Sequence, residues 1–395
     1  MKKVLGIGNA LTDILLQVSD KDIKELNLPK GSMNLISFDT AVDIQSRFAS
    51  VRKTMVAGGS ASNTITAISA LGGKTAFIGK IGNDEIGDFY RNDIQKNNVK
   101  PILMPSSLMS GYCTALITPD GERTMCTYLG ASADLSEDDI RAEHFTGYDI
   151  FHIEGYMLQS HELIKKALRL AKEAGLYVSL DLGSYNVVNE NREFLHELIN
   201  QYVDIVFANE DESFAYTHLS PEESVAEIAR QCEIAVVKIG KRGSYVQKGD
   251  ELHHIGAITS KCLDSTGAGD LYAAGFLHGL SEDLDIRRCA EIGTLAAGRV
   301  VEIVGTKLPE ETWEEIRRLC ALYRGFMRKY ENDKKVILYE NTIHFIPVPN
   351  RYSHFPAING VYGYSNGIDR PLEKLETGSR NTAILVEKLL LSSFP

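Results

Sequence analysis

Asp264-Ser265-Thr266-Gly267-Ala268-Gly269-Asp270 is the stretch around which the chain is organised. A short extended run over 257–263 precedes it, and an apolar, helix-forming run over 271–277 follows it. Its small residues let backbone N–H groups approach a ligand without obstruction by a Cβ atom. A helix that begins here directs its unpaired N–H groups and the positive end of its dipole at that ligand. The stretch therefore predicts an anion-binding turn at the start of a helix.

Asp270 lies inside this turn, where its carboxylate could accept the proton of a hydroxyl group that faces the anion. Phosphoryl transfer to an alcohol requires both parts at one point. The alternative interpretation is a strand-to-helix turn with a capping Asp, which a lone Gly-Ala-Gly would favour. The seven-residue pattern is more specific than that.

The composition and net charge limit the classes of protein to which the chain can belong. The chain has 395 residues, of which 44% are hydrophobic and 24% charged, and a net charge of −11. Nucleic-acid surfaces need clustered Lys and Arg, so this charge argues against one. It does not exclude an enzyme that handles phosphate, because backbone amides and Mg²⁺ can hold the anion.

The six cysteines are scattered without a C-x-x-C pair, which fits reduced thiols better than disulfides or a zinc site. The N-terminal residues 1–5 are too poor in apolar side chains for a signal peptide, and no apolar stretch reaches membrane-spanning length. We therefore expect a cytoplasmic protein that binds neither a membrane nor nucleic acid.

Apolar strands that alternate with helices predict the fold. Such strands indicate an α/β protein with a mostly parallel central sheet and helices on both faces. Ligands of these sheets bind at the carboxyl ends of the strands. Asp181, Asn209, Gly240 and Asp264 all follow such ends. The strands are expected at 3–7, 76–84, 149–153, 176–182, 203–208 and 235–239.

Further polar residues follow the early strands. Asp13 comes just after the first strand, where one carboxylate can accept two hydrogen bonds from a vicinal diol. A turn or capping Asp is the alternative.

The glycine-rich stretch 57–63 precedes an apolar helix that Ser60 could cap. Asp-Gly within 119–123, between β-rich runs at 112–118 and 124–129, predicts a hairpin.

The pattern at 264–270 resembles the signature of the ribokinase-like (PfkB) sugar and nucleoside kinases. The turn at 57–63, an Asn-x-x-Glu pattern at 209–212 and a glycine turn at 238–244 accompany it in the expected order. The resemblance covers about residues 1–330. It implies a ribokinase-like fold with a small β-sheet lid.

The domain organisation follows from this resemblance. We expect a kinase domain over 1–335, with lid strands from about 11–37 and 110–130. Residues 336–395 change character and are expected to form a C-terminal appendage of unknown role. Within the appendage we predict a short strand at 336–339 and a helix at 382–391.

The resemblance also assigns roles to residues. Asp270 is the implied catalytic base, and the backbone amides of Gly267, Ala268 and Gly269 hold the transferred phosphoryl group. The substrate hydroxyls are assigned to Asp13, Gly58, Gly59 and Asn63.

Four more residues are candidates for substrate binding, each with an alternative. Met33 either covers a base or fills the core of the lid. Arg123 either reaches the phosphates or is an exposed turn residue. Tyr128 and Tyr156 either stack on a base or belong to the core.

The nucleotide side is assigned in the same way. Asn209 and Glu212 match a motif tied to Mg²⁺ and phosphate, although an acidic helix start is the alternative. Lys238 stands where the family often has Thr or Ser, which leaves its side-chain contact open. The remaining candidates for ATP binding are Gly240, Gly243, Thr266 and Ala297, the last in a small-residue helix that would approach the adenine.

Within the family, 31–36, 120–131, 154–156 and 264–271 are most similar to the adenosine kinase-like members from bacteria. The implied activity is ATP-dependent phosphorylation of the primary 5′-hydroxyl of adenosine or a related nucleoside, by direct in-line transfer. Mg²⁺ is the implied metal, and a monovalent cation is compatible with the resemblance. The alternatives are a sugar kinase acting on a ribose- or fructose-type furanose and a non-catalytic sensor. The partner is a small molecule, and the protein is a monomer or a homodimer.

Overall fold

The computed structural model describes residues 1–333, 337–339 and 342–344. The chain divides into two compact units, Met1–Arg324 and Gly325–Pro395. In the second unit, β15 (Ile337–Tyr339) and β16 (Thr342–His344) pair antiparallel. The strand predicted at 336–339 coincides with β15, whereas the helix predicted at 382–391 lies outside the described residues. None of the helices in the described part is both long and apolar enough to cross a membrane.

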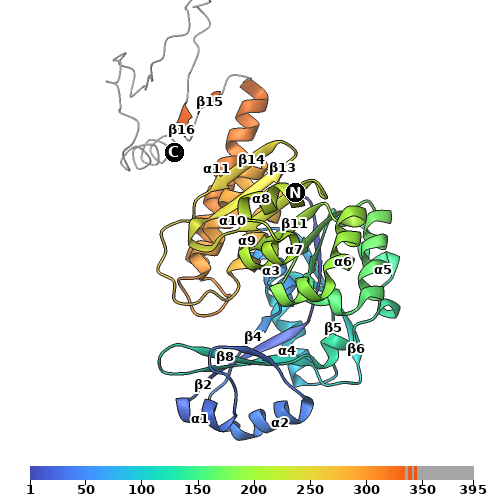
Figure 1. Ribbon diagram of the computed structural model, residues 1–395, viewed down its shortest axis with the longest axis vertical. Helices are drawn as coiled ribbons and strands as arrows, with labels where there is room; N and C mark the ends of the chain where they lie inside the picture. Colours follow the sequence, from blue (N-terminus) through green and yellow to red (C-terminus); the bar gives the residue numbers. More distant parts are fainter. Residues whose placement is uncertain (334–336, 340–341, 345–395) are drawn as a thin grey trace, which may run out of the picture. The chain divides into compact units, whose positions relative to one another are not determined.

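A nine-stranded sheet is the centre of the first unit, in the order β14-β13-β12-β11-β10-β9-β1-β5-β6 (Figure 1). The strands from β12 to β6 pair in parallel, whereas β13 and β14 add an antiparallel hairpin at one edge. The sequence therefore predicted the fold class correctly. The strands are β1 (Val4–Ile7), β5 (Thr75–Gly82), β6 (Val99–Ser106), β9 (Ile150–Glu154), β10 (Tyr177–Asp181), β11 (Ile205–Asn209), β12 (Ile234–Lys238), β13 (Ser244–Lys248) and β14 (Glu251–Ile255).

Helices cover both faces of this sheet, and several begin just after a strand (Figure 1). The helices of the first unit outside the lid are α3 (Ser60–Ala70), α4 (Glu85–Lys96), α5 (His161–Glu173), α6 (Tyr185–Tyr202), α7 (Glu210–Thr217), α8 (Pro221–Ile228), α9 (Ala268–Ser281), α10 (Ile286–Val300) and α11 (Glu310–Asp333), the last continuing into the second unit.

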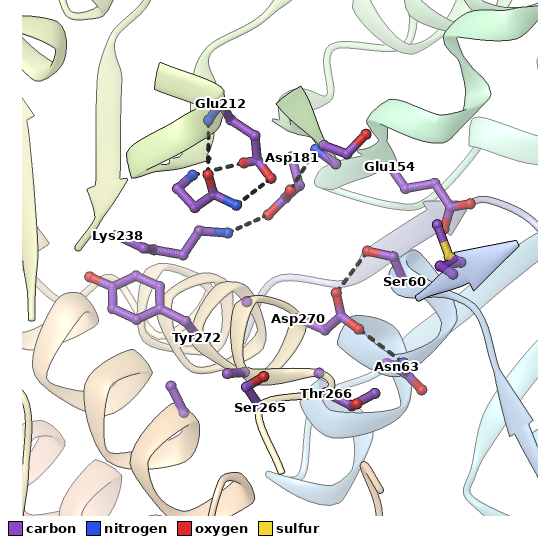
Figure 2. A pocket seen from close by; sticks show the side chains of 18 of the residues that line it. Ser60, Asn63, Glu154, Asp181, Glu212, Lys238, Ser265, Thr266, Asp270 and Tyr272 are labelled. Atoms are coloured by element: carbon purple, nitrogen blue, oxygen red, sulfur yellow. Dashed lines mark hydrogen bonds and ion pairs between the residues drawn. The ribbon is translucent and has the colours of Figure 1, made fainter. Parts of the chain in front are cut away.

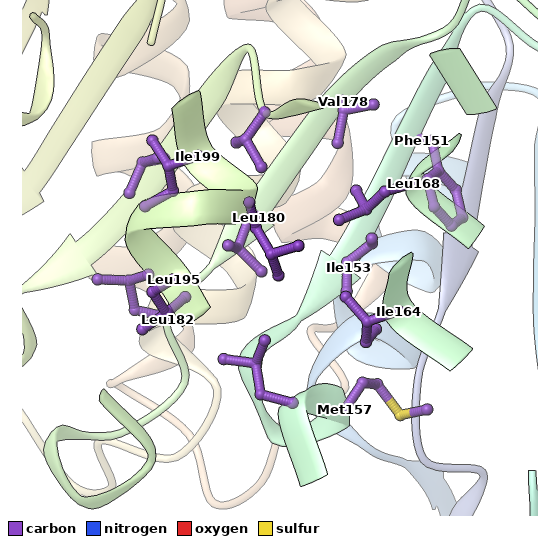
Figure 3. Packing of buried hydrophobic residues seen from close by; sticks show 14 of the residues in the cluster. Phe151, Ile153, Met157, Ile164, Leu168, Val178, Leu180, Leu182, Leu195 and Ile199 are labelled. Carbon is purple, nitrogen blue, oxygen red and sulfur yellow. The ribbon is translucent and has the colours of Figure 1, made fainter. Parts of the chain in front are cut away.

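The strands are apolar along their whole length because both of their faces are buried. In β11, Val206 and Ala208 belong to the large core cluster under α5, α6 and α8. Phe207 points to the other face and packs edge-on against Phe276 of α9, with ring centroids 5.4 Å apart. Figure 3 shows part of the first of these two layers. The two layers fix the strand ends, and with them the polar residues that follow.

A second, five-stranded sheet in the order β3-β8-β7-β2-β4 forms the lid. Apolar residues from one face of this sheet form a core with helices α1 (Asp20–Glu25) and α2 (Phe38–Arg47), among them Ile14, Leu16 and Ile44. Residues of the opposite parity therefore face away from these helices. The strands of the lid are β2 (Leu11–Gln17), β3 (Met33–Leu35), β4 (Thr54–Gly58), β7 (Gly111–Ile117) and β8 (Arg123–Tyr128).

Four features differ from the prediction. The edge strands β4 and β6 and the hairpin β13–β14 were not predicted from the sequence. In β6, Pro101 and Pro105 argue against a strand, and they are tolerated because β6 lies at the edge of the sheet. The run 257–263, expected to be extended, contains no strand, and the strand that precedes the motif is β14.

Candidate active site

A cavity opens where the strands of the central sheet end and the lid faces them. Its volume is about 1360 Å³. Pockets for one small molecule usually measure roughly 300–1,000 Å³, so this cavity has room for two ligands side by side. Figure 2 shows the side chains that line it.

The motif 264–270 forms the centre of the cavity wall. Gly267 precedes α9 and has φ +75°, a left-handed conformation in which a Cβ atom would overlap the side chain of Thr306. The helix then begins at Ala268, so the amides of its first turn, including that of Gly269, have no partner within the helix. Gly267, Ala268, Gly269 and Thr266 all line the cavity, as the sequence predicted for an anion-binding turn.

Asp270 connects this turn to α3. Its carboxylate accepts hydrogen bonds from Ser60 Oγ at 2.7 Å and from Asn63 Nδ2 at 2.9 Å (Figure 2). The carboxylate faces the cavity, yet the surrounding protein removes most of its water. This burial raises the pKa of Asp270 to about 6, although the hydrogen bonds from Asn63 and Ser60 oppose the rise. Asp270 is therefore ionised at neutral pH but close to the range of a general base.

Ser60 does not cap α3 as the sequence analysis expected. The N-cap is Gly59, which has φ +91° and makes no side-chain capping bond. A Cβ atom at Gly59 would overlap the carbonyl oxygen of Asn9. Ser60 is instead the first helical residue, and its hydroxyl group is free to hold Asp270.

Glu154, at the end of β9, is a cavity residue that was not predicted from the sequence. Its buried carboxylate accepts from the backbone and side-chain amides of Asn9, both at 2.8 Å, and from Ala61 N at 2.7 Å. Burial raises the pKa of Glu154 to about 7. The available signal was an acidic residue directly after a buried apolar strand, at the edge where ligands bind.

Asp13 lies on β2, on the face of the lid that turns toward the cavity. Burial raises the pKa of Asp13 to about 7, against the opposing charge of Arg123, and the negative charge of Asp270 adds to the rise. Gly58 does not line the cavity. A Cβ atom at Gly58 would overlap the carboxylate of Asp13, so this glycine makes room for the acid.

The lid contributes an apolar wall. Met33 and Leu35 are 56% and 64% exposed and line the cavity, so Met33 does not fill the core of the lid. Tyr128 lies on the other face, where it packs against Phe38 and Tyr112 with ring centroids 5.8 Å from each. This placement corrects the expectation that Tyr128 stacks on a substrate. The other cavity-facing residues of the lid are Leu11, Cys113, Met125, Thr127 and Leu129.

Tyr156 lines the cavity on the side of the central sheet, and its hydroxyl group donates to the carbonyl of Gly183 at 2.9 Å. Arg123 is neither an exposed turn residue nor part of the cavity lining. Its side chain is 11% exposed and pairs with Asp264 at 2.9 Å. Arg123 thus ties the lid to the start of the motif.

Asn209 and Glu212 cap α7 reciprocally. Asn209 N and Nδ2 donate to the carboxylate of Glu212 at 2.7 and 2.6 Å, and Glu212 N donates to Asn209 Oδ1 at 2.8 Å. Burial and the charge of Asp181 raise the pKa of Glu212. The helix-start interpretation is therefore correct, and both residues also line the cavity.

Lys238 is the last residue of β12 and points at Asp181, with Nζ 2.8 Å from Oδ2 (Figure 2). Both side chains are largely buried in the cavity wall. Gly240, Gly243 and Ala297 also line the cavity.

An anion-binding turn with a carboxylate base, at the carboxyl edge of an α/β sheet, defines a phosphotransferase that acts on an alcohol group. A sequence profile of the pfkB family of carbohydrate kinases matches residues 30–313. The chain therefore belongs to the pfkB carbohydrate kinase family.

This chain is similar to the following three proteins. The crystal structure of adenosine kinase from Sinorhizobium meliloti is 33% identical with a TM-score of 0.72, and the match covers 80% of this chain and 99% of that one. A probable sugar kinase from Rhizobium etli is 32% identical with a TM-score of 0.73, covering 80% and 98%. A 5-dehydro-2-deoxygluconokinase from Clostridium perfringens is 30% identical over 265 residues, which are 62% of this chain and 78% of that protein. These relatives agree on a kinase and differ in substrate.

Proposed function

We propose that the protein transfers the γ-phosphoryl group of ATP to the primary 5′-hydroxyl of a nucleoside, with adenosine as the first candidate. The observation that carries this proposal is the lining of the half of the cavity under the lid. That half combines an apolar wall with the acidic groups Asp13 and Glu154.

The charges of the lining separate two classes of acceptor. The two cationic residues among the lining residues are Lys238 and Lys241, and both lie on the nucleotide side. A sugar acid would therefore place its carboxylate near Asp13 and Glu154 without a cation among the residues that line this half of the cavity, which is unfavourable in a partly dry site. A neutral nucleoside fits better, because its ribose diol can donate to Asp13 and its base can lie against Met33 and Leu35.

The transfer itself is a direct displacement. The oxygen of the 5′-hydroxyl group attacks the γ-phosphorus, the bond from that phosphorus to the β–γ bridging oxygen breaks, and ADP leaves with the electron pair. The hydroxyl proton passes to Asp270, which Ser60 and Asn63 hold in place. The amides of Gly267, Ala268 and Gly269 stabilise the negative charge on the transferred group.

The donor set fits Mg²⁺. Among the described residues no group of three or more His, Cys, Asp or Glu side chains is placed to hold a metal ion. Mg²⁺ keeps several waters and needs only one or two carboxylates together with phosphate oxygens. Glu212 would hold it, and the bound ion would supply neutralisation of the phosphate charge.

The second candidate is a kinase for a neutral furanose sugar. The 30% identity to a sugar-acid kinase places sugar phosphorylation within reach of this fold. A free sugar would satisfy Asp13 and Glu154 equally well, but it would leave the apolar wall of the lid without a partner. The wall therefore favours the nucleoside.

An ATP-consumption assay across an acceptor panel tests the proposal. We expect kcat/KM for adenosine to exceed that for ribose, fructose and 5-dehydro-2-deoxygluconate by about 30- to 150-fold, because burying the base against apolar side chains adds about 2–3 kcal/mol. Turnover of a sugar and not of any nucleoside contradicts the proposal. Binding of a nucleoside without turnover of any compound identifies a sensor instead.

The pH dependence provides a second test. A raised carboxyl pKa means that the proton is retained to higher pH, and protonated Asp270 cannot act as a base. We expect kcat to fall about tenfold per pH unit below about 6 and to level off above about 7. The value of kcat/KM for the acceptor should begin to fall already near pH 7, because Asp13 must also be ionised. A kcat that stays constant from pH 8 to pH 5 contradicts the role of Asp270.

A further inference from the structure

The ammonium group of Lys238 has unused hydrogen-bonding capacity beside the anion-binding turn. An ammonium group carries three N–H donors. Within the described part of the chain this group makes one hydrogen bond, to Asp181 Oδ2 at 2.8 Å. The Lys238 and Asp181 side chains are 14% and 9% exposed, so bulk water does not satisfy the remaining donors well. A charged donor in such a position is suited to bind an anion.

The position of Lys238 Nζ relative to α9 indicates which anion the ammonium group could bind. An ideal Cβ atom built on Gly269 would lie 3.1 Å from Lys238 Nζ. The ammonium group therefore faces the first turn of α9, where Gly267 and Gly269 line the cavity, whereas Ala268 N donates to Ser265 O at 3.2 Å. Figure 2 shows Lys238 on one side of the space in front of α9 and Asp270 on the other. An anion held by the amides of α9 also comes within reach of Lys238.

The surrounding charges keep Lys238 protonated. Burial alone would work against its charge, but Asp181 and Glu212 outweigh this effect and hold the pKa of Lys238 above its ordinary value. Asp181 is fixed in turn, because its Oδ1 accepts from Gly183 N at 3.0 Å. The lysine is thus pre-positioned before any ligand arrives.

We propose that Lys238 is a catalytic residue that donates a hydrogen bond to an oxygen of the transferred phosphoryl group, while Asp181 acts as the positioning residue that holds it. This inference rests on the proposed kinase function. The oxygens of the phosphoryl group carry the charge of the transition state, and a fixed ammonium group stabilises that charge without reorganisation. The step remains the transfer described above, with the proton going to Asp270 and the electron pair leaving with ADP.

The test compares two charge-neutral double variants. Asp181→Asn with Lys238→Met removes the pair without leaving a buried charge. Its matched control is Asp204→Asn with Lys172→Met, because Lys172 Nζ also lies 2.8 Å from an Asp oxygen and Asp204 also accepts a backbone N–H, from Val178. Lys172 lies on α5 and Asp204 directly precedes β11, and neither residue lines the cavity of the candidate active site. Both variants are assayed with the full chain and adenosine, after their melting temperatures are compared with that of the wild type.

We expect the Asp181/Lys238 variant to lose about 100-fold in kcat, with the Kd for adenosine, measured without nucleotide, changed less than threefold. The control should keep kcat within threefold. Lys238→Arg keeps a charged donor and should therefore retain most of the wild-type kcat. Lys238→Met alone is assayed in place of the double variant if that variant does not fold. A kcat within threefold of the wild type in the Asp181/Lys238 variant overturns the inference.

A second readout separates catalysis from structure. ATPγS places a sulfur atom on the transferred group, where it accepts a weaker hydrogen bond than oxygen. We expect the ratio of kcat with ATP to kcat with ATPγS to fall at least threefold in the Asp181/Lys238 variant relative to the wild type. An unchanged ratio means that the loss arises from a distorted site and overturns the inference. A wild-type protein that phosphorylates no acceptor removes the proposed function and this inference together, whereas an active wild type with an unaffected variant removes the inference alone.

Discussion

Replacing Asp270 by Asn is expected to lower kcat by about 10³- to 10⁴-fold while adenosine still binds. The amide has nearly the same shape as the carboxylate, and its oxygen can accept from Asn63 while its NH₂ group donates to the hydroxyl oxygen of Ser60. The site therefore keeps its geometry and loses only the proton acceptor. Single-turnover kinetics and calorimetric titration with adenosine measure the two effects separately.

The matched control for this variant is Asp285→Asn. Asp285 is also an acid at a helix start, where it caps α10, but it lies outside the cavity lining. This variant should keep kcat within twofold and lose about 1 kcal/mol of stability at most. A kcat for Asp270→Asn within tenfold of the wild type would show that another group accepts the proton.

The second large effect is expected at Asp13. We expect Asp13→Ala to lower kcat/KM for adenosine by about 10³-fold, because two hydrogen bonds from the ribose diol to a buried carboxylate contribute about 3–6 kcal/mol together. Most of this loss should appear in KM, since Asp13 lies on the lid and Asp270 remains held by α3.

Acceptors without the diol test this assignment directly. The wild type should discriminate strongly between adenosine and 2′,3′-dideoxyadenosine, and Asp13→Ala should discriminate less than tenfold. If the variant keeps the discrimination of the wild type, another residue binds the diol. Asp20→Ala in α1 of the lid is the control, because its exposed side chain pairs with Lys30 at the surface and should leave both acceptors unaffected.

The main architecture could be predicted because it is expressed in local patterns. The parallel strands are mostly apolar because both of their faces are buried, and several are followed by a helix, so the pattern along the chain indicates the sheet. The edge strands escaped prediction because edges tolerate residues that the centre excludes, such as Pro101 and Pro105 of β6.

The site was predictable where a motif concentrates its chemistry, as at 264–270, and less so where partners come from distant segments. Ser60 and Asp270 are 210 residues apart, and nothing near Ser60 indicates this hydrogen bond. Tyr128 was assigned to the wrong face for a different reason. One face of β8 lines the cavity and the other packs on the core under α2. The sequence of β8 therefore lacks the alternation of apolar and polar residues that would distinguish the face of Thr127 from that of Tyr128.

The hydrogen bonds of Glu154 have a mechanical consequence. The chain leaves the central sheet for the lid at Asn9, between β1 and β2, and returns from it at Gly59, between β4 and α3. Glu154 holds these two crossings, through the two amides of Asn9 and the backbone of Ala61. The chain crosses again after β6 and after β8, so a swing of the lid would move those crossings while the two held by Glu154 stay in place. Asp270, which Ser60 and Asn63 of α3 hold, would stay with the central sheet throughout the swing.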